Sequence, residues 1–172
     1  MRNYLFLSFL FGCMFHGMGQ YVDRTFFKAG FHAAATLGDA SDAANLGIGV
    51  DLYQHWGISK KFDLGLTSGV MYFFGLESTE DIGPVAVTTR GEDTVYVPIG
   101  ALVRYYPTAS INFGTDVGYT VGLNDFSQSG LYYRPTVGID LTTTTALTIS
   151  FMGVEFDDGR WNQITAGIVF RF

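Results

Sequence analysis

The printed sequence ends in Ile164-Thr165-Ala166-Gly167-Ile168-Val169-Phe170-Arg171-Phe172, where apolar side chains alternate with small or polar ones. Successive side chains of a β-strand point to opposite faces, so this period of two predicts a strand. One face carries Ile164, Ala166, Ile168, Phe170 and Phe172, and the other carries Thr165, Gly167 and Arg171. Either membrane lipid or the core of a soluble sheet can cover such an apolar face, and the rest of the chain must decide between them.

The opposite end of the sequence has the pattern of an export signal. Arg2 precedes an apolar run over residues 4–14, and small residues follow it. We therefore predict a cleaved secretory signal peptide over residues 1–20 and a single β-barrel domain over residues 21–172. An alternative for this segment is lipidation at Cys13, because the three residues before it resemble a lipobox. If the signal is removed after residue 20, no cysteine remains for a disulfide.

The composition agrees with an exported all-β protein. The 172 residues include 22 Gly, 16 Phe and 10 Tyr, with 15% charged residues and a formal net charge of -6. Phe and Tyr suit the lipid face of a barrel and its interfacial rings, while Gly suits the crowded interior. No apolar run after the signal approaches the ~20 residues of a spanning helix. The acidic balance and the lack of a Lys/Arg cluster exclude nucleic acid as an expected partner.

Eight alternating segments follow one another, each long enough for the ~9–11 residues that a tilted strand needs to cross a bilayer. They are residues 25–37, 46–57, 62–74, 94–106, 110–123, 131–141, 146–156 and 161–172. Short connections alternate with longer ones, so the predicted fold is all-β: an eight-stranded antiparallel up-and-down transmembrane β-barrel. The even strand count places both termini on the periplasmic side. Pro98 and Pro135 lack a ladder donor, and we expect bulges or loop-proximal positions there.

The charged residues fall on one side of this alternation. A Lys or Arg that faces lipid at mid-bilayer costs about 2–4 kcal/mol, so the charged face must be the lumen. The predicted lumen holds Lys28, Asp51, Asp63, Arg104, Asp116, Arg134 and Asp140, with Arg171 at the periplasmic rim. An eight-stranded interior is just wide enough for side chains to fill it, and buried charges require partners. We therefore predict an ion-pair network that closes the lumen.

Together these features give the chain a family resemblance. It resembles the small eight-stranded outer-membrane β-barrel proteins of Gram-negative bacteria, the OmpA/OmpX type without a periplasmic domain. The matching features are the signal segment, the alternation of short turns with long loops, and the ending with Phe170 and Phe172, which resembles the signal read by the barrel-insertion machinery. The resemblance implies a cell outer-membrane location, contact with outer-membrane lipids and lipopolysaccharide, insertion by that machinery, and roles from structural stabilisation to adhesion.

The residues argue against an enzyme. Some small barrels of this class resemble lipid A deacylases or acyltransferases, which use His and Ser on the outer rim, but the sequence contains no His-x-Ser. His32 and His55 fall on the luminal side of the alternation, where a hydrogen-bonded interior histidine is expected. Gly-x-Ser-x-Gly, His-Glu-x-x-His and clustered Cys/His ligands are absent as well. We predict no catalytic residues, no metal and no cofactor.

The predicted outer loops are acidic. They carry Asp39, Asp42, Glu77, Glu80, Asp81, Glu92, Asp93, Asp125, Asp157 and Asp158. Such loops usually serve solubility, and no EF-hand spacing appears; bridging by Ca²⁺ or Mg²⁺ to lipopolysaccharide is the alternative. The longest loop, residues 75–93, is the first candidate for an extracellular partner, because recognition tends to lie on long loops of a rigid scaffold.

Three functional hypotheses follow. The first is a non-enzymatic outer-membrane barrel with a structural or surface-interaction role carried by its outer loops. The second is a narrow channel for small solutes. The third is a soluble, lipocalin-like barrel for a small apolar ligand, in which the apolar faces point inward. The alternation with a period of two is the same in the first and third hypotheses, so it does not distinguish them.

Overall fold

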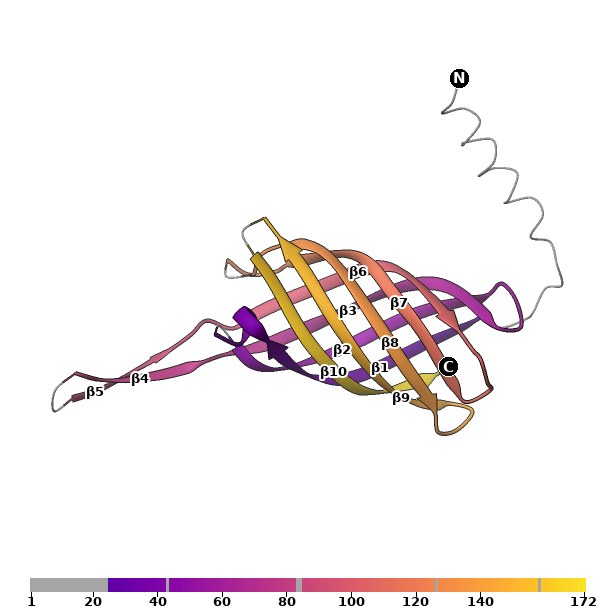
Figure 1. Cartoon of the computed structure of the whole chain (residues 1–172), viewed down its shortest axis with the longest axis horizontal. Coiled ribbons are helices and arrows are strands. Elements are labelled where there is room, and N and C mark those ends of the chain that lie inside the picture. The colour runs from indigo at the N-terminus through magenta and orange to yellow at the C-terminus, as the bar shows by residue number, and fades with distance from the viewer. Residues whose placement is uncertain (1–24, 43, 83–84, 126, 158) are drawn as a thin grey trace, which may run out of the picture.

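A computed structural model describes residues 25–172, apart from residues 43, 83–84, 126 and 158. Eight strands form a closed barrel in which every neighbouring pair is antiparallel (Figure 1). They are β1 (Phe26–Leu37), β2 (Ala44–Gly57), β3 (Phe62–Gly75), β6 (Thr94–Tyr105), β7 (Ile111–Gly122), β8 (Gly130–Asp140), β9 (Thr145–Phe156) and β10 (Gly159–Arg171). Pairing of β1 with β10 closes the barrel, so the predicted fold class is confirmed. The predicted signal peptide lies outside the described residues.

The two ends of the barrel differ in their connections. Short turns at residues 58–61, 106–110 and 141–144 lie at one end, which we call the short-turn end. Both barrel termini lie there too, because the N–H of Phe172 donates to the carbonyl of Phe27 at 2.9 Å. The other end, the long-loop end, carries the 3-10 helix η1 (Gly38–Asp42) and the longer connections. No helix within the described residues is long and apolar enough to span a bilayer.

The longest connection is more regular than the expected loop. Within it β4 (Glu77–Ile82) and β5 (Val85–Arg90) pair as a two-stranded antiparallel ribbon that extends away from the barrel (Figure 1). The β-branched residues of β5, two Val and two Thr, favour an extended backbone. The predicted longest loop, residues 75–93, therefore contains a ribbon, and it connects two barrel strands at the long-loop end.

The two strand prolines are accommodated without the expected bulges. Pro98 lies inside β6 and Pro135 inside β8. The register on the two sides of each proline is the same, as shown by the pairs Ser68↔Ile99 and Met71↔Tyr96, and by Tyr133↔Gly153 and Thr136↔Ser150. Pairing is interrupted only between those positions, so the missing donor leaves a short gap in one ladder rather than a shifted strand.

Glycine allows close approach of strands in the interior. Gly118 of β7 lies opposite Gly100 of β6. A Cβ atom on Gly118 would lie 2.1 Å from the carbonyl oxygen of Ile99 and 2.5 Å from the Cα of Gly100. A side chain does not fit at that distance, so the close approach of β6 and β7 at this point requires glycine.

Candidate functional site

The centre of the lumen is occupied by a buried ion-pair network around Arg134. This side chain of β8 is 1% exposed. Its Nη1 atom lies 2.8 Å from Oδ1 of Asp51, and its Nη2 atom lies 2.7 Å from Oδ2 of Asp116. Arg104 adds a second cation, with Nη1 2.6 Å from Oδ1 of Asp116. Strands β2, β6, β7 and β8 are thereby connected through the middle of the barrel.

Hydroxyl groups and a histidine complete the network. Nη2 of Arg134 donates to the Tyr53 hydroxyl at 3.2 Å and to the Thr67 hydroxyl at 3.1 Å. Nδ1 of His32 lies 2.8 Å from the second oxygen of Asp51. Buried charges are tolerated when each is paired and hydrogen-bonded, and removal of one partner leaves an uncompensated charge. The network therefore holds the barrel interior in one arrangement.

A layer of aromatic and methionine side chains lies between the network and the long-loop end. Its members are Met71, Phe73, Tyr96, Tyr132, Met152, Val154 and Trp161, together with Ala34, Ala40 and Ala44. Trp161 packs edge-on against Phe73 with ring centroids 5.2 Å apart. Its Nε1 donates to Gln163, whose amide nitrogen lies 3.5 Å and 3.3 Å from the two methionine sulfurs. We call this group the aromatic–methionine layer.

The sequence interpretation missed this layer. The alternation was used to place charged residues inside, whereas aromatic residues were assigned to the lipid face and its rings. Applied to Phe73 and Trp161, the same alternation places both side chains in the lumen, because each is two residues from another inward position. The alternation in the sequence was therefore sufficient to predict that these two side chains point inward.

Three of the seven predicted lumen residues lie away from the network, at the short-turn end. Lys28 and Asp140 are half-buried, while Asp63 is fully buried, with Oδ2 3.6 Å from Nδ1 of His55. These three side chains line a cavity of about 110 Å³, with Arg171 at its exposed edge. The structure thus separates the predicted set into a central group of four and a group of three at the mouth.

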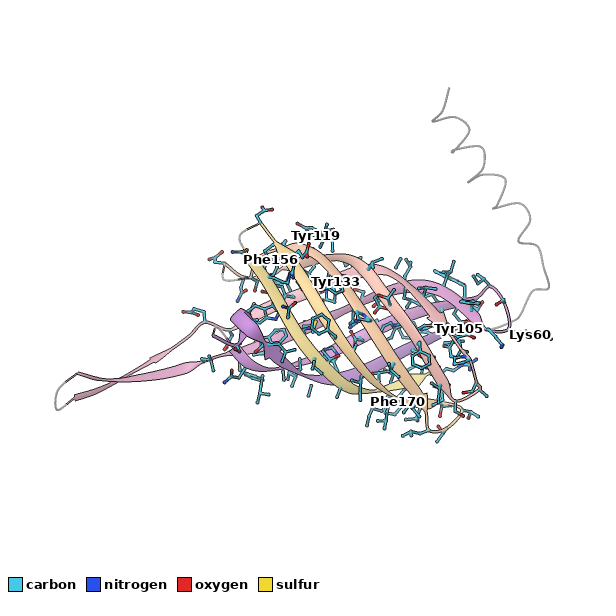
Figure 2. The ribbon with its side chains drawn as sticks, viewed as in Figure 1. Lys60, Tyr105, Tyr119, Tyr133, Phe156 and Phe170 are labelled. Atoms are coloured by element: carbon cyan, nitrogen blue, oxygen red, sulfur yellow. The ribbon has the colours of Figure 1, made fainter. Side chains whose placement is uncertain are left out.

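The outer face is divided into two aromatic rings and an aliphatic belt. The ring at the short-turn end includes Phe27, Trp56, Phe62, Tyr105, Phe113, Phe170 and Phe172, and the ring at the long-loop end includes Tyr72, Phe74, Tyr119 and Tyr133. Figure 2 shows Tyr105 and Phe170 near one end and Tyr119 near the other. Aliphatic side chains dominate between the rings, for example Leu66, Ile99, Val117 and Ile149.

Charged side chains are excluded from the outer belt. Among the described strand residues, none of the outward positions between the two rings is Asp, Glu, Lys or Arg. The outward pair Glu155 and Arg160, 2.9 Å apart, lies at the long-loop end. In the short turns Lys60 and Lys61 are exposed. The apolar belt has the position and composition of a lipid-facing surface.

The two histidines among the described residues lie inside the barrel and away from the outer rim. His32 and His55 are both buried, next to Asp51 and Asp63. In the part of the chain that the structure describes, no group of three or more His, Cys, Asp or Glu side chains is placed to hold a metal ion. Neither histidine therefore has the geometry of a rim-exposed hydrolase site.

Comparison with known proteins identifies the fold. No protein-family model and no curated protein matches the chain. Solved structures do match. The outer-membrane protein Ail of Yersinia pestis in a phospholipid nanodisc is 13% identical, with a TM-score of 0.57 over 87% of this chain and 100% of that one. The N-terminal β-barrel domain of Pseudomonas aeruginosa OprF is also 13% identical, with a TM-score of 0.51 over 87% and 100%. A de novo designed transmembrane β-barrel is 8% identical, with a TM-score of 0.54 over 89% and 100%. The fold is therefore that of the small eight-stranded outer-membrane β-barrels.

Proposed function

We propose that this chain is an integral outer-membrane β-barrel that performs no catalysis and has a structural and surface-interaction role. The observation that carries the proposal is the uncharged belt between two aromatic rings, outside a barrel whose central charges are paired inside. Each barrel strand has 11 to 14 residues, which exceeds what a tilted strand needs to cross a bilayer. A lipocalin-like barrel would have the opposite arrangement, with apolar side chains inside and charges outside.

The proposed orientation places the short-turn end in the periplasm and the long-loop end outside the cell. Short periplasmic turns and longer external loops are the rule in this class of barrel. Phe170 and Phe172 lie exposed on the outer face of the last strand, where the barrel-insertion machinery would meet them as the proposed insertion signal. This orientation exposes Lys60 and Lys61 to the periplasm and the acidic connections to the outside.

The charge of the long-loop end favours a cationic partner. Its connections carry ten acidic residues and one basic residue, Arg90, while Arg160 at the start of β10 pairs with Glu155 of β9. Ail has been solved in complex with sucrose octasulfate, a heparin analogue and a polyanion. The acidic surface of this chain would repel such a ligand, so a basic protein surface is the better electrostatic match. The β4–β5 ribbon is the proposed first contact, because it extends farthest from the barrel (Figure 1).

Conduction is the weaker candidate function. The ion-pair network and the aromatic–methionine layer occupy successive levels of the lumen. The cavities along the short-turn half measure about 110 Å³ and about 20 Å³. A solute that entered from the short-turn end would meet both layers before it reached the other end. We therefore propose a closed barrel that supports its loops without transporting solutes.

Two linked measurements test the membrane proposal. The folded protein is compared with and without boiling on an SDS gel, and its recovery in the outer-membrane fraction is measured. A closed membrane barrel keeps its fold in the detergent, so we expect a mobility shift on boiling together with outer-membrane recovery. Solubility without detergent and an unshifted band would overturn the proposal in favour of the lipocalin-like barrel.

A further inference from the structure

The short-turn mouth contains two like charges placed directly opposite each other. Lys28 of β1 and Arg171 of β10 are register partners across the seam that closes the barrel. Like charges in opposite positions of two strands destabilise a sheet. Among the described residues, no carboxylate oxygen lies within 4.0 Å of either cation. The fold thus brings together two positive charges that are not neutralised at contact distance.

An aromatic ring positions these two cations. Nζ of Lys28 lies 5.2 Å from the ring centre of Phe26, and Cζ of Arg171 lies 4.0 Å from the same ring centre. His55 stacks on this ring as well, with centroids 4.7 Å apart. Cation–π contacts of this kind fix where the cations lie, but a neutral ring leaves their charge in place.

Both cations line the cavity of about 110 Å³ at this mouth. A water molecule needs about 10–15 Å³ of such space, so the cavity has room for several waters or for one small oxyanion. The threonine-rich segment over residues 142–145, from the last short turn into β9, forms another part of the wall. The cavity lies inside the ring of strands, so its ligand is a free solute rather than a lipid headgroup.

The accessible charges at the cavity are mostly cationic. Asp63 also lines it but is fully buried beside His55, whereas Asp140 is half-buried at the mouth. Lys28 and Arg171 contribute two positive charges to the lining, and Asp63 and Asp140 contribute two negative charges, so the lining is formally neutral (2 − 2). Of the two carboxylates, only that of Asp140 is accessible at the mouth, opposite two cations.

We propose that the short-turn mouth binds a small oxyanion, the phosphate or carboxylate group of a free solute, between Lys28 and Arg171. Charge-assisted hydrogen bonds from an ammonium and a guanidinium to one anion are among the stronger polar contacts in proteins. This site goes beyond the proposed structural and surface role. It depends on the geometry of the mouth and is independent of the side of a membrane that the mouth faces.

The test titrates inorganic phosphate into the barrel refolded in detergent micelles and measures binding by calorimetry and by amide NMR shifts of residues 142–146. We expect saturable binding of one phosphate. Lys28→Gln and Arg171→Gln should each weaken binding by about tenfold or more, since each removes one charge-assisted contact. Asp140→Asn should strengthen it, because it removes the accessible negative charge at the mouth.

A matched control separates a site from general attraction to positive charge. Lys61→Gln removes an exposed lysine at the same end, outside the cavity, and should leave phosphate binding unchanged. A wild-type barrel without saturable binding, an equal loss in Lys61→Gln, or weaker binding in Asp140→Asn would overturn the proposal. The boiling-dependent mobility shift verifies the fold of each variant. If Lys28→Gln does not fold, the exposed Arg171 position gives the same readout.

Discussion

The inner and outer faces of the same eight strands are organised by different physical rules. An outer residue such as Ile149 needs only to be apolar, because the lipid that we propose around the belt offers it no specific partner. An inner residue such as Arg134 needs named partners at fixed distances, and it has contacts from Asp51, Tyr53 and Asp116. The contacts that specify the fold therefore lie mainly in the lumen. The outer face determines whether the barrel is stable in lipid or in water.

Loss of the central cation should have the largest effect on stability. Arg134→Ala leaves the carboxylates of Asp51 and Asp116 without their shared partner, and breaking such a buried pair costs about 3–5 kcal/mol. Urea unfolding of the barrel in lipid vesicles measures this loss. Arg160→Ala is the control, because its ion pair with Glu155 is exposed and should contribute about 0–1 kcal/mol. An equal loss of unfolding free energy in the two variants would show that the luminal network contributes no more to stability than an exposed ion pair.

A charge on the outer belt should have the next largest effect. Ile149→Arg places a guanidinium on the outer face near the middle of β9, where lipid exposure costs about 2–4 kcal/mol. Leu131→Arg is also exposed but lies at the beginning of β8, at the long-loop end, and should cost about 0–1 kcal/mol. The same unfolding assay compares the two variants. A cost that is independent of depth would contradict a bilayer around the belt.

Removal of the ribbon should change stability only slightly. The N–H of Gly91 donates to the carbonyl of Leu76 at 2.6 Å, so the two ends of the ribbon are already in contact. Deleting residues 77–90 and joining these ends should alter the free energy of unfolding by about 1 kcal/mol or less, because loop length contributes weakly to stability. Failure of this variant to show the boiling-dependent shift would mean that the ribbon is part of the folding unit.

The smallest expected effect is that of removing one cation from the ion-pair network, which should leave the conductance of the barrel unchanged. Arg104→Ala removes one cation from the network but leaves the aromatic–methionine layer intact. We therefore expect no single-channel current from the wild type or from this variant in planar bilayers. Currents in the wild type that change in Arg104→Ala would support the narrow-channel hypothesis and contradict the closed lumen.

The sequence was sufficient for the architecture because alternation is a local property. Each strand, including the alanine-rich β1, can be located from its own residues. The inward direction of the charges follows from the same alternation. Which charges meet does not, because Arg134 and Asp51 are 83 residues apart and their contact depends on the register of all strands between them. For the same reason, the sequence does not give the depth of each charge along the barrel. That depth separates Lys28, Asp63 and Asp140 from the network.

The two tryptophans allow the most direct test of which face meets lipid. Trp56 is 42% exposed on the outer face at the short-turn ring, whereas Trp161 is 8% exposed inside the aromatic–methionine layer. The variants Trp161→Phe and Trp56→Phe each keep one of them. In vesicles of brominated phosphatidylcholine, the fluorescence of Trp56 should be strongly quenched and that of Trp161 should be nearly unchanged. Unquenched Trp56, or stronger quenching of Trp161, would contradict a barrel with its apolar belt in lipid.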